Sequence, residues 1–90
     1  MKTAHILITG FVQGIGFRSF IRSQAKKLGL TGWVRNLHNG RVEILVQGEE
    51  EKIKKLIEAC REGPSMAEVD DLTIEWNEKN EIFDSFRILK

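Results

Sequence analysis

The hydrophobic positions in the first third of the chain follow two different periods. Over residues 5–12 apolar residues recur at every second position, with Ile6 and Ile8 on one face, which predicts a β-strand. From Phe17 onward the spacing becomes that of a helix. Gly29 is typical of a left-handed helix stop, so the predicted helix ends there. The residues on one side of this helix are Phe17, Phe20, Ile21, Gln24, Ala25 and Leu28.

Two short apolar runs in the middle of the chain predict a β-hairpin. They cover residues 31–37 and 41–47 and flank residues 38–40, which include the pair Asn39 and Gly40. An Asn-Gly pair between apolar runs favours a hairpin turn, because both residues tolerate positive φ. The predicted buried face of the second strand is formed by Val42, Ile44 and Val46.

The last part of the chain predicts a second helix and two further strands. The helix runs from residue 49 to about residue 62, and Gly63 ends it. Strands are predicted at residues 69–76 and 82–89, with a polar turn at residues 77–81 between them. The apolar stripe of the helix consists of Ile53, Leu56, Ile57 and Cys60.

The predicted order is strand, helix, strand, strand, helix, strand, with an additional short strand at the end. This order is typical of an α+β fold, the ferredoxin-like split βαββαβ sandwich, in which two helices cover one face of an antiparallel sheet. A chain of 90 residues can form one such core and is too short to divide further. We therefore expect a single domain that covers residues 1–90.

The charge of the chain is nearly balanced. Its 14 basic and 13 acidic residues give a formal net charge of +1. No overall field therefore draws the chain to nucleic acid or to an anionic membrane, and any anion must be bound by local groups. With 41% hydrophobic and 30% charged residues, the composition is that of a globular protein rather than of a disordered segment.

Cysteine content and the first residues of the chain favour a cytoplasmic protein. The single cysteine, Cys60, excludes an internal disulfide, and no N-terminal apolar run has the length of a signal peptide or a membrane span. A reducing cytoplasm is therefore the expected compartment. Cys60 also lies on the apolar side of its predicted helix, which favours packing in the core over a reactive thiol.

The stretch GFVQGIGFRSF, at residues 10–20, has the composition of an anion-binding turn. It joins the first strand to the first helix, where backbone N–H groups lack partners and the helix dipole is positive. Gly14 and Gly16 allow the main chain to approach a bound oxygen closely. Arg18 adds a planar guanidinium that can donate two parallel hydrogen bonds to a phosphate. Spacing alone is equally compatible with a plain glycine-rich turn.

Nucleotide-binding interpretations of this stretch fit less well. The dinucleotide fingerprint requires a third glycine where this chain has Ser19, and a P-loop requires a Gly-Lys-Ser or Gly-Lys-Thr sequence that the chain lacks. An RNA-recognition motif has a similar layout and is the more serious alternative. Its signature lies on the third strand, however, and carries basic and aromatic residues at the positions of Gln13 and Ile15.

Two sequence signatures together resemble the acylphosphatase family. The first, VQGIGFR at residues 12–18, matches the family's loop, and the second, GWVRN at residues 32–36, matches its pattern of Gly, aromatic, apolar, variable and Asn. The segment GPSMAEV at residues 63–69 is similar to the loop before the family's fourth strand, so the resemblance covers nearly the whole chain. One departure is Leu37, where some members carry a hydroxyl residue. The resemblance extends to domains within larger carbamoyl-transferring maturation proteins.

This resemblance implies hydrolysis of a carboxyl-phosphate anhydride to a carboxylate and inorganic phosphate. Arg18 and Asn36 are implied as the catalytic residues, with Asn36 orienting the water that attacks in line. No cofactor and no metal is implied, since neither signature contains Asp, Glu, His or Cys. The residues implied to bind the substrate are Gln13, Gly14, Ile15, Gly16, Phe17 and Arg18.

The expected partners follow from the same resemblance. They are a small acyl phosphate as substrate and inorganic phosphate as product and competitive inhibitor. Neither nucleic acid nor a membrane is expected to bind. We expect the chain to act as a monomer.

Other conspicuous residues have simpler interpretations. His5 and His38 are isolated in sequence and lack a carboxylate or cysteine at ligand spacing, so both are expected at the surface. Arg22 lies one helical turn beyond Arg18. It either extends the positive potential of the loop or belongs to a solvated helix face, and the sequence leaves both possibilities open.

Overall fold

The computed structural model, which describes residues 1–77 and 82–90, contains its elements in the order that the hydrophobic pattern predicts. Both helices lie close to their predicted bounds, whereas the first strand begins earlier than predicted. Of the polar turn predicted at residues 77–81, residues 78–81 lie outside the described residues. The elements are β1 (Lys2–Phe11), α1 (Phe17–Lys27), β2 (Thr31–Asn36), β3 (Val42–Gly48), α2 (Glu50–Glu62), β4 (Glu68–Asn77) and β5 (Phe86–Ile88).

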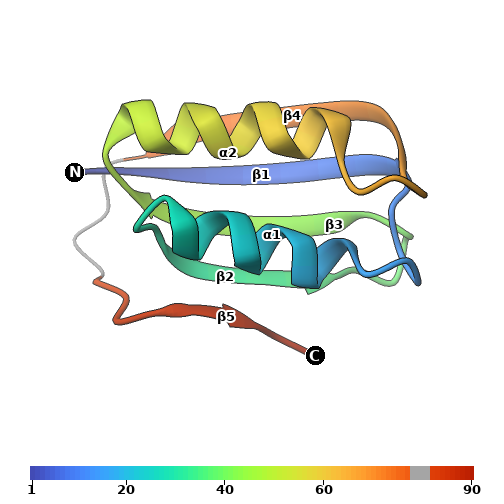
Figure 1. Cartoon of the computed structure of the whole chain (residues 1–90), viewed down its shortest axis with the longest axis horizontal. Helices are drawn as coiled ribbons and strands as arrows, with labels where there is room; N and C mark the ends of the chain where they lie inside the picture. Colours follow the sequence, from blue (N-terminus) through green and yellow to red (C-terminus); the bar gives the residue numbers. More distant parts are fainter. Residues whose placement is uncertain (78–81) are drawn as a thin grey trace.

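The described strands form one sheet in the order β4-β1-β3-β2-β5. Both helices lie on the same face of this sheet, with α1 near β2 and β5 and α2 near β4 (Figure 1). This arrangement confirms the ferredoxin-like sandwich. Neither helix in the described part of the chain is long and apolar enough to cross a membrane.

The sheet is mixed rather than wholly antiparallel, because β5 pairs with β2 in parallel. β4 ends at Asn77, which lies opposite Thr3 at the start of β1. Gln47 lies opposite both Thr3 and Thr31, so β2 begins at that same end of the sheet. The chain therefore leaves β4 at the end of the sheet where β2 starts. A strand that follows β4 and pairs with β2 from that end runs parallel to β2.

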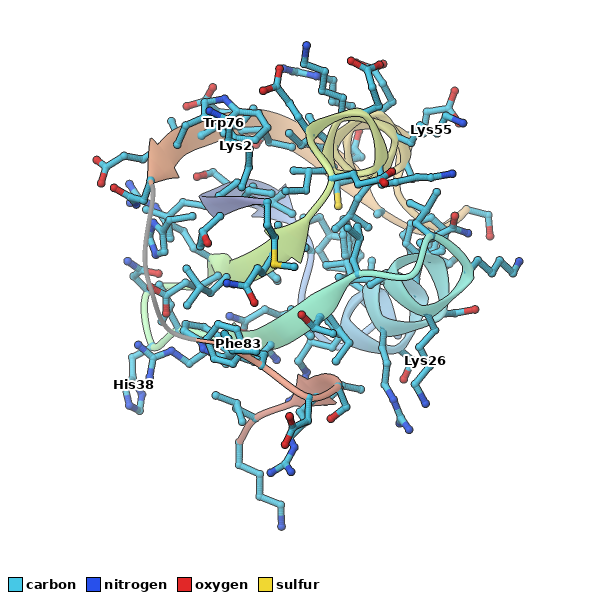
Figure 2. The ribbon with its side chains drawn as sticks, turned by 90° about the vertical axis from the view of Figure 1, so that its left-hand side faces the viewer. Lys2, Lys26, His38, Lys55, Trp76 and Phe83 are labelled. Atoms are coloured by element: carbon cyan, nitrogen blue, oxygen red, sulfur yellow. The ribbon has the colours of Figure 1, made fainter. Side chains whose placement is uncertain are left out.

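β5 is also shorter than the strand predicted at residues 82–89, because only Phe86–Ile88 pair with β2. Before them the backbone N–H of Phe83 donates to Oε1 of Gln47 at 3.4 Å. Figure 2 shows Phe83 on the side of the sheet away from the helices. This segment therefore covers a sheet face instead of extending the sheet edge.

The core lies between the sheet and the helices. Ile6 and Ile8 of β1 and Leu56 of α2 are fully buried, as their spacing predicted. Cys60 is fully buried as well, and burial raises the pKa of its thiol to about 12. The thiol therefore stays protonated at neutral pH, which confirms its predicted packing role.

The sheet face away from the helices carries an ion-paired cluster that spans three strands. Glu43 lies 2.6 Å from His5 Nε2 and 2.5 Å from Arg35 Nε. Burial alone would raise the pKa of Glu43, but hydrogen bonds from His5 and Arg35 lower it below its ordinary value.

The predicted surface position was right for His38, which is exposed, and only partly right for His5, which is half-buried. The carboxylate partner of His5 is Glu43, which the pairing of β1 with β3 brings close to it, so spacing along the sequence could not predict this contact.

Candidate active site

The loop between β1 and α1 turns at two glycines between two buried anchors. Val12 and Phe17 are each 1% exposed and fix the two ends of the loop in the core. Between them Gly14 and Gly16 have φ values of 77° and 80°, a left-handed conformation that favours glycine. A Cβ at either position would meet no atom of the described residues within 4 Å. The backbone conformation, and not crowding, therefore favours glycine here.

The N-terminus of α1 carries no neutralising side chain. Its cap residue is Gly16, which makes no side-chain hydrogen bond to the first N–H groups, and its first turn contains no acidic residue. The first N–H groups and the helix dipole therefore keep a positive potential at the loop. A bound anion would accept hydrogen bonds from these N–H groups, and the positive potential would stabilise its charge.

Asn36, the last residue of β2, presents an unpaired polar atom. Its Oδ1 is buried and has no hydrogen-bond partner within the described residues. A buried oxygen of this kind costs about 1–3 kcal/mol while it stays unpaired. Native proteins rarely keep such an atom unless a water molecule or a ligand completes it.

A pocket of about 100 Å³ joins the loop, the helix and the strand. The predicted site residues Gly14, Gly16, Phe17, Arg18 and Asn36 all line it. The other three lining residues are Val12, Ser19 and Ile88. Val12 and Ser19 adjoin predicted site residues in sequence. Ile88 comes from β5, and no sequence signal marked it as a site residue.

The side chains of Gln13 and Ile15 lie outside the lining of this pocket. Nε2 of Gln13 donates hydrogen bonds to the backbone oxygens of Leu37 and Arg41, at 2.8 and 2.9 Å. Ile15 packs, partly buried, against the core. Both side chains therefore hold the loop in place, and a contribution to anion binding would come from their backbone N–H groups.

Arg18 extends from the first turn of α1 toward the C-terminal strand. Its Nη1 donates a hydrogen bond to the backbone oxygen of Leu89 at 3.3 Å. The ion pairs of the described residues do not include Arg18. A guanidinium has five N–H donors, so most of those of Arg18 are available to a bound anion.

A larger depression of about 310 Å³ lies elsewhere on the surface. Its lining includes Trp33, Phe83 and Arg87, but none of the glycine loop at residues 12–16. It contains neither the start of α1 nor the unpaired oxygen of Asn36. We therefore assign the candidate site to the smaller pocket.

Gly16→Ala is expected to weaken both stability and phosphate binding. A residue with a Cβ in the left-handed conformation costs about 1–2 kcal/mol, and relaxation of the loop would move the N–H groups at the helix start. Gly29→Ala is the matched control, because Gly29 also has a positive φ of 71° and open space around it, but lies beyond the other end of α1.

Urea unfolding and calorimetric titration with phosphate measure the two effects. Both variants should have a lower free energy of unfolding than the wild type. Only Gly16→Ala should bind phosphate more weakly. Equal phosphate binding by the wild type and Gly16→Ala would show that the loop does not hold the anion.

Comparisons with known proteins point to one family. The acylphosphatase family model matches residues 4–88. An acylphosphatase of Moorella thermoacetica is 49% identical over 75 residues, which are 83% of this chain and 81% of the relative.

Solved structures agree with this match. The crystal structure of acylphosphatase from Bacillus subtilis has a TM-score of 0.97 and 37% identity, with all of both chains covered. The crystal structure of full-length HypF in the phosphate- and nucleotide-bound form has a TM-score of 0.85 and 32% identity, and the match covers 100% of this chain and 12% of that one. Because the family model spans almost the whole chain, including the glycine loop and Asn36, the chain belongs to the acylphosphatase family.

Proposed function

We propose that the chain hydrolyses the carboxyl-phosphate anhydride of small acyl phosphates, giving a carboxylate and inorganic phosphate. Membership of the acylphosphatase family supports an enzyme that acts on acyl phosphates. The observation that carries the proposal is the unpaired, buried Oδ1 of Asn36, which belongs to a residue lining the same pocket as Arg18 and the start of α1. The N–H groups of Arg18 and of the start of α1 suit a phosphoryl group, and Oδ1 of Asn36 suits a water molecule.

N–H groups of the main chain and of Arg18 bind the phosphoryl group. The backbone N–H groups of residues 13–18 donate to its oxygens, and Arg18 supplies the cation. Each charge-assisted hydrogen bond contributes about 1.5–3 kcal/mol. The same donors stabilise the charge that redistributes over the phosphoryl oxygens during the reaction.

The leaving group needs no acid from the protein. A carboxylic acid has a pKa of about 4, so a carboxylate departs as a stable anion without being protonated. The lining of the pocket accordingly contains no Asp, Glu or His among the described residues. Positioning and electrostatics are sufficient for this chemistry.

Asn36 orients the attacking water. Its Oδ1 accepts a hydrogen bond from the water, whose oxygen attacks phosphorus in line with the departing carboxylate. The bond from phosphorus to the acyl oxygen breaks as the new bond forms, and its electron pair leaves with the carboxylate. A neutral amide is too weak a base to take the proton of the water near neutral pH, so this proton passes to a phosphoryl oxygen.

Incubation with acetyl phosphate, beside glycerol phosphate and a short RNA, tests the proposed reaction. We expect phosphate release from acetyl phosphate alone, because an alkoxide leaving group requires a general acid that the pocket lacks. RNA binding without turnover would instead support the RNA-recognition alternative. Against that alternative, the glycine-rich stretch lies between β1 and α1 rather than on the third strand.

Activity is expected to survive removal of divalent metal ions. No group of three or more His, Cys, Asp or Glu side chains that could hold a metal occurs within residues 1–77 and 82–90. Arg18 and the N–H groups balance the phosphate charge instead. The rate with acetyl phosphate should be the same with and without EDTA. A loss of activity in EDTA that magnesium restores would contradict this mechanism.

We further propose that residues 1–90 act as one domain and as a monomer in the cytoplasm. One sheet with one core supports a single domain, and an unpaired, buried Cys60 suits a reducing compartment. Inorganic phosphate is proposed as a competitive inhibitor, because it presents similar oxygens to the pocket. Gel filtration tests the monomeric state, and inhibition kinetics test whether phosphate competes with the substrate.

A further inference from the structure

The side chain of Gln13 joins the glycine loop to the turn between β2 and β3. Its Nε2 donates a hydrogen bond to the backbone oxygen of Leu37 at 2.8 Å and another to that of Arg41 at 2.9 Å. A side-chain amide has two N–H donors, so both are used here. The loop and the turn lie at the same end of the sheet (Figure 1). Gln13 therefore connects two segments that are far apart in the sequence.

Backbone pairing does not connect these two segments in the described part of the chain. The pairing of β1 with β3 stops at Ile8 and Val42 and includes neither segment, and the last residues of β1 pair with β4 instead. The turn forms hydrogen bonds within itself, since the N–H of Leu37 donates to the oxygen of Arg41 at 2.9 Å. Within the described residues, the hydrogen bonds that join the loop to the turn therefore come from Gln13.

Each end of this link adjoins a residue that lines the phosphate pocket. Gln13 precedes Gly14 of the loop, and Leu37 follows Asn36 of β2. Oδ1 of Asn36 has no hydrogen-bond partner within the described residues, so no such bond fixes the position of this oxygen. Its distance from the loop therefore depends on where the end of β2 lies, and the bond from Gln13 to Leu37 holds that end.

We propose that Gln13 is a positioning residue, which holds Asn36 at the distance from the phosphate-binding loop that the reaction requires. This inference rests on the proposed function, in which Asn36 orients the attacking water. Without the two hydrogen bonds, the end of β2 becomes free to move relative to the loop, and the water loses its alignment with the breaking bond. Phosphate binding persists, because the buried side chains of Val12 and Phe17 still fix the loop.

Gln13→Met tests this role, because methionine has a similar length and no N–H donor in its side chain. We expect kcat for acetyl phosphate to fall roughly tenfold, whereas phosphate inhibition should change by less than about twofold. Gln24→Met makes the same exchange on α1, outside the lining of the pocket, and should keep the wild-type kcat. The rates are measured well below Tm of each variant, so that a loss of stability does not lower kcat.

A double-mutant cycle with Asn36→Ala shows whether Gln13 acts through Asn36. In the Asn36→Ala background the water is no longer oriented, so Gln13→Met should lower kcat further by less than about twofold. A residue that only supports the fold would instead cause the same roughly tenfold loss in both backgrounds.

The outcomes separate this inference from the proposed function. Equal losses of kcat in both backgrounds, an unchanged kcat in Gln13→Met, or phosphate inhibition that weakens as much as kcat falls would overturn the positioning role and leave the hydrolase activity standing. A near-normal kcat in Asn36→Ala would remove the water-orienting role that this inference requires. Failure of the wild type to hydrolyse acetyl phosphate would overturn both the inference and the proposed function.

Discussion

Asn36→Ala is expected to lower kcat for acetyl phosphate by about 100-fold or more while leaving KM and phosphate inhibition nearly unchanged. In the proposed mechanism the amide of Asn36 contacts the water and not the phosphoryl group. Its removal leaves the glycine loop and Arg18 in place, so substrate binding should persist. The water loses its fixed position in line with the breaking bond, so the loss falls on the chemical step.

The stability of Asn36→Ala separates a chemical defect from a folding defect. Because Oδ1 of Asn36 is buried without a partner in the described residues, its removal should not lower Tm. Asn77→Ala is the matched control and should keep the wild-type kcat, since Asn77 ends β4 opposite Thr3, at the end of the sheet away from the loop. A near-normal kcat with much weaker phosphate inhibition in Asn36→Ala would make Asn36 a phosphate-binding residue.

Arg18→Ala is expected to weaken phosphate inhibition by roughly 100-fold and to lower kcat/KM by at least as much. Two charge-assisted hydrogen bonds of about 1.5 kcal/mol each amount to about 3 kcal/mol, which corresponds to this factor. Both constants change because the phosphoryl oxygens are bound in the ground state and in the transition state. Initial rates with acetyl phosphate, measured at several phosphate concentrations, give both constants.

A graded series identifies what Arg18 contributes. Arg18→Lys should lose only about tenfold, because lysine keeps the charge and lacks the planar fork. Arg61→Lys makes the same exchange on α2, in the last turn of that helix, and should have no effect on phosphate inhibition. If a folded Arg18→Ala protein were inhibited by phosphate as strongly as the wild type, the phosphate site would lie elsewhere.

The order of elements could be predicted because the local signals agree with one another. The apolar residues at period two in β1 and the helical stripe of α1 are buried in one common core. Gly29 has a φ of 71° and follows Leu28, the C-terminal cap of α1, as its position predicted. The direction of β5 could not be predicted in this way. It depends on where β4 ends in the assembled sheet, which is determined by the pairing of β4 with β1.

From residue spacing alone, the candidate site could be predicted only where its residues are neighbours in sequence, whereas Asn36 was predicted from the resemblance to the acylphosphatase family. Gly14, Gly16 and Arg18 fall within one short stretch, and both glycines have the positive φ that their residue type permits. Ile88 of the pocket and the Leu89 oxygen that binds Arg18 come from the other end of the chain. No periodicity connects those residues with the loop, because parallel pairing of β5 with β2 brings them there.

Hydrolysis of acetyl phosphate in water enriched in heavy oxygen, with phosphorus NMR of the phosphate and mass spectrometry of the acetate, tests the proposed reaction most directly. Attack of water on phosphorus predicts that the label enters phosphate and not acetate, at a rate far above the reaction without protein. The same labelling should continue in EDTA and should slow by about 100-fold in Asn36→Ala. Label in acetate, or phosphate release no faster than without the protein, would contradict the proposed function.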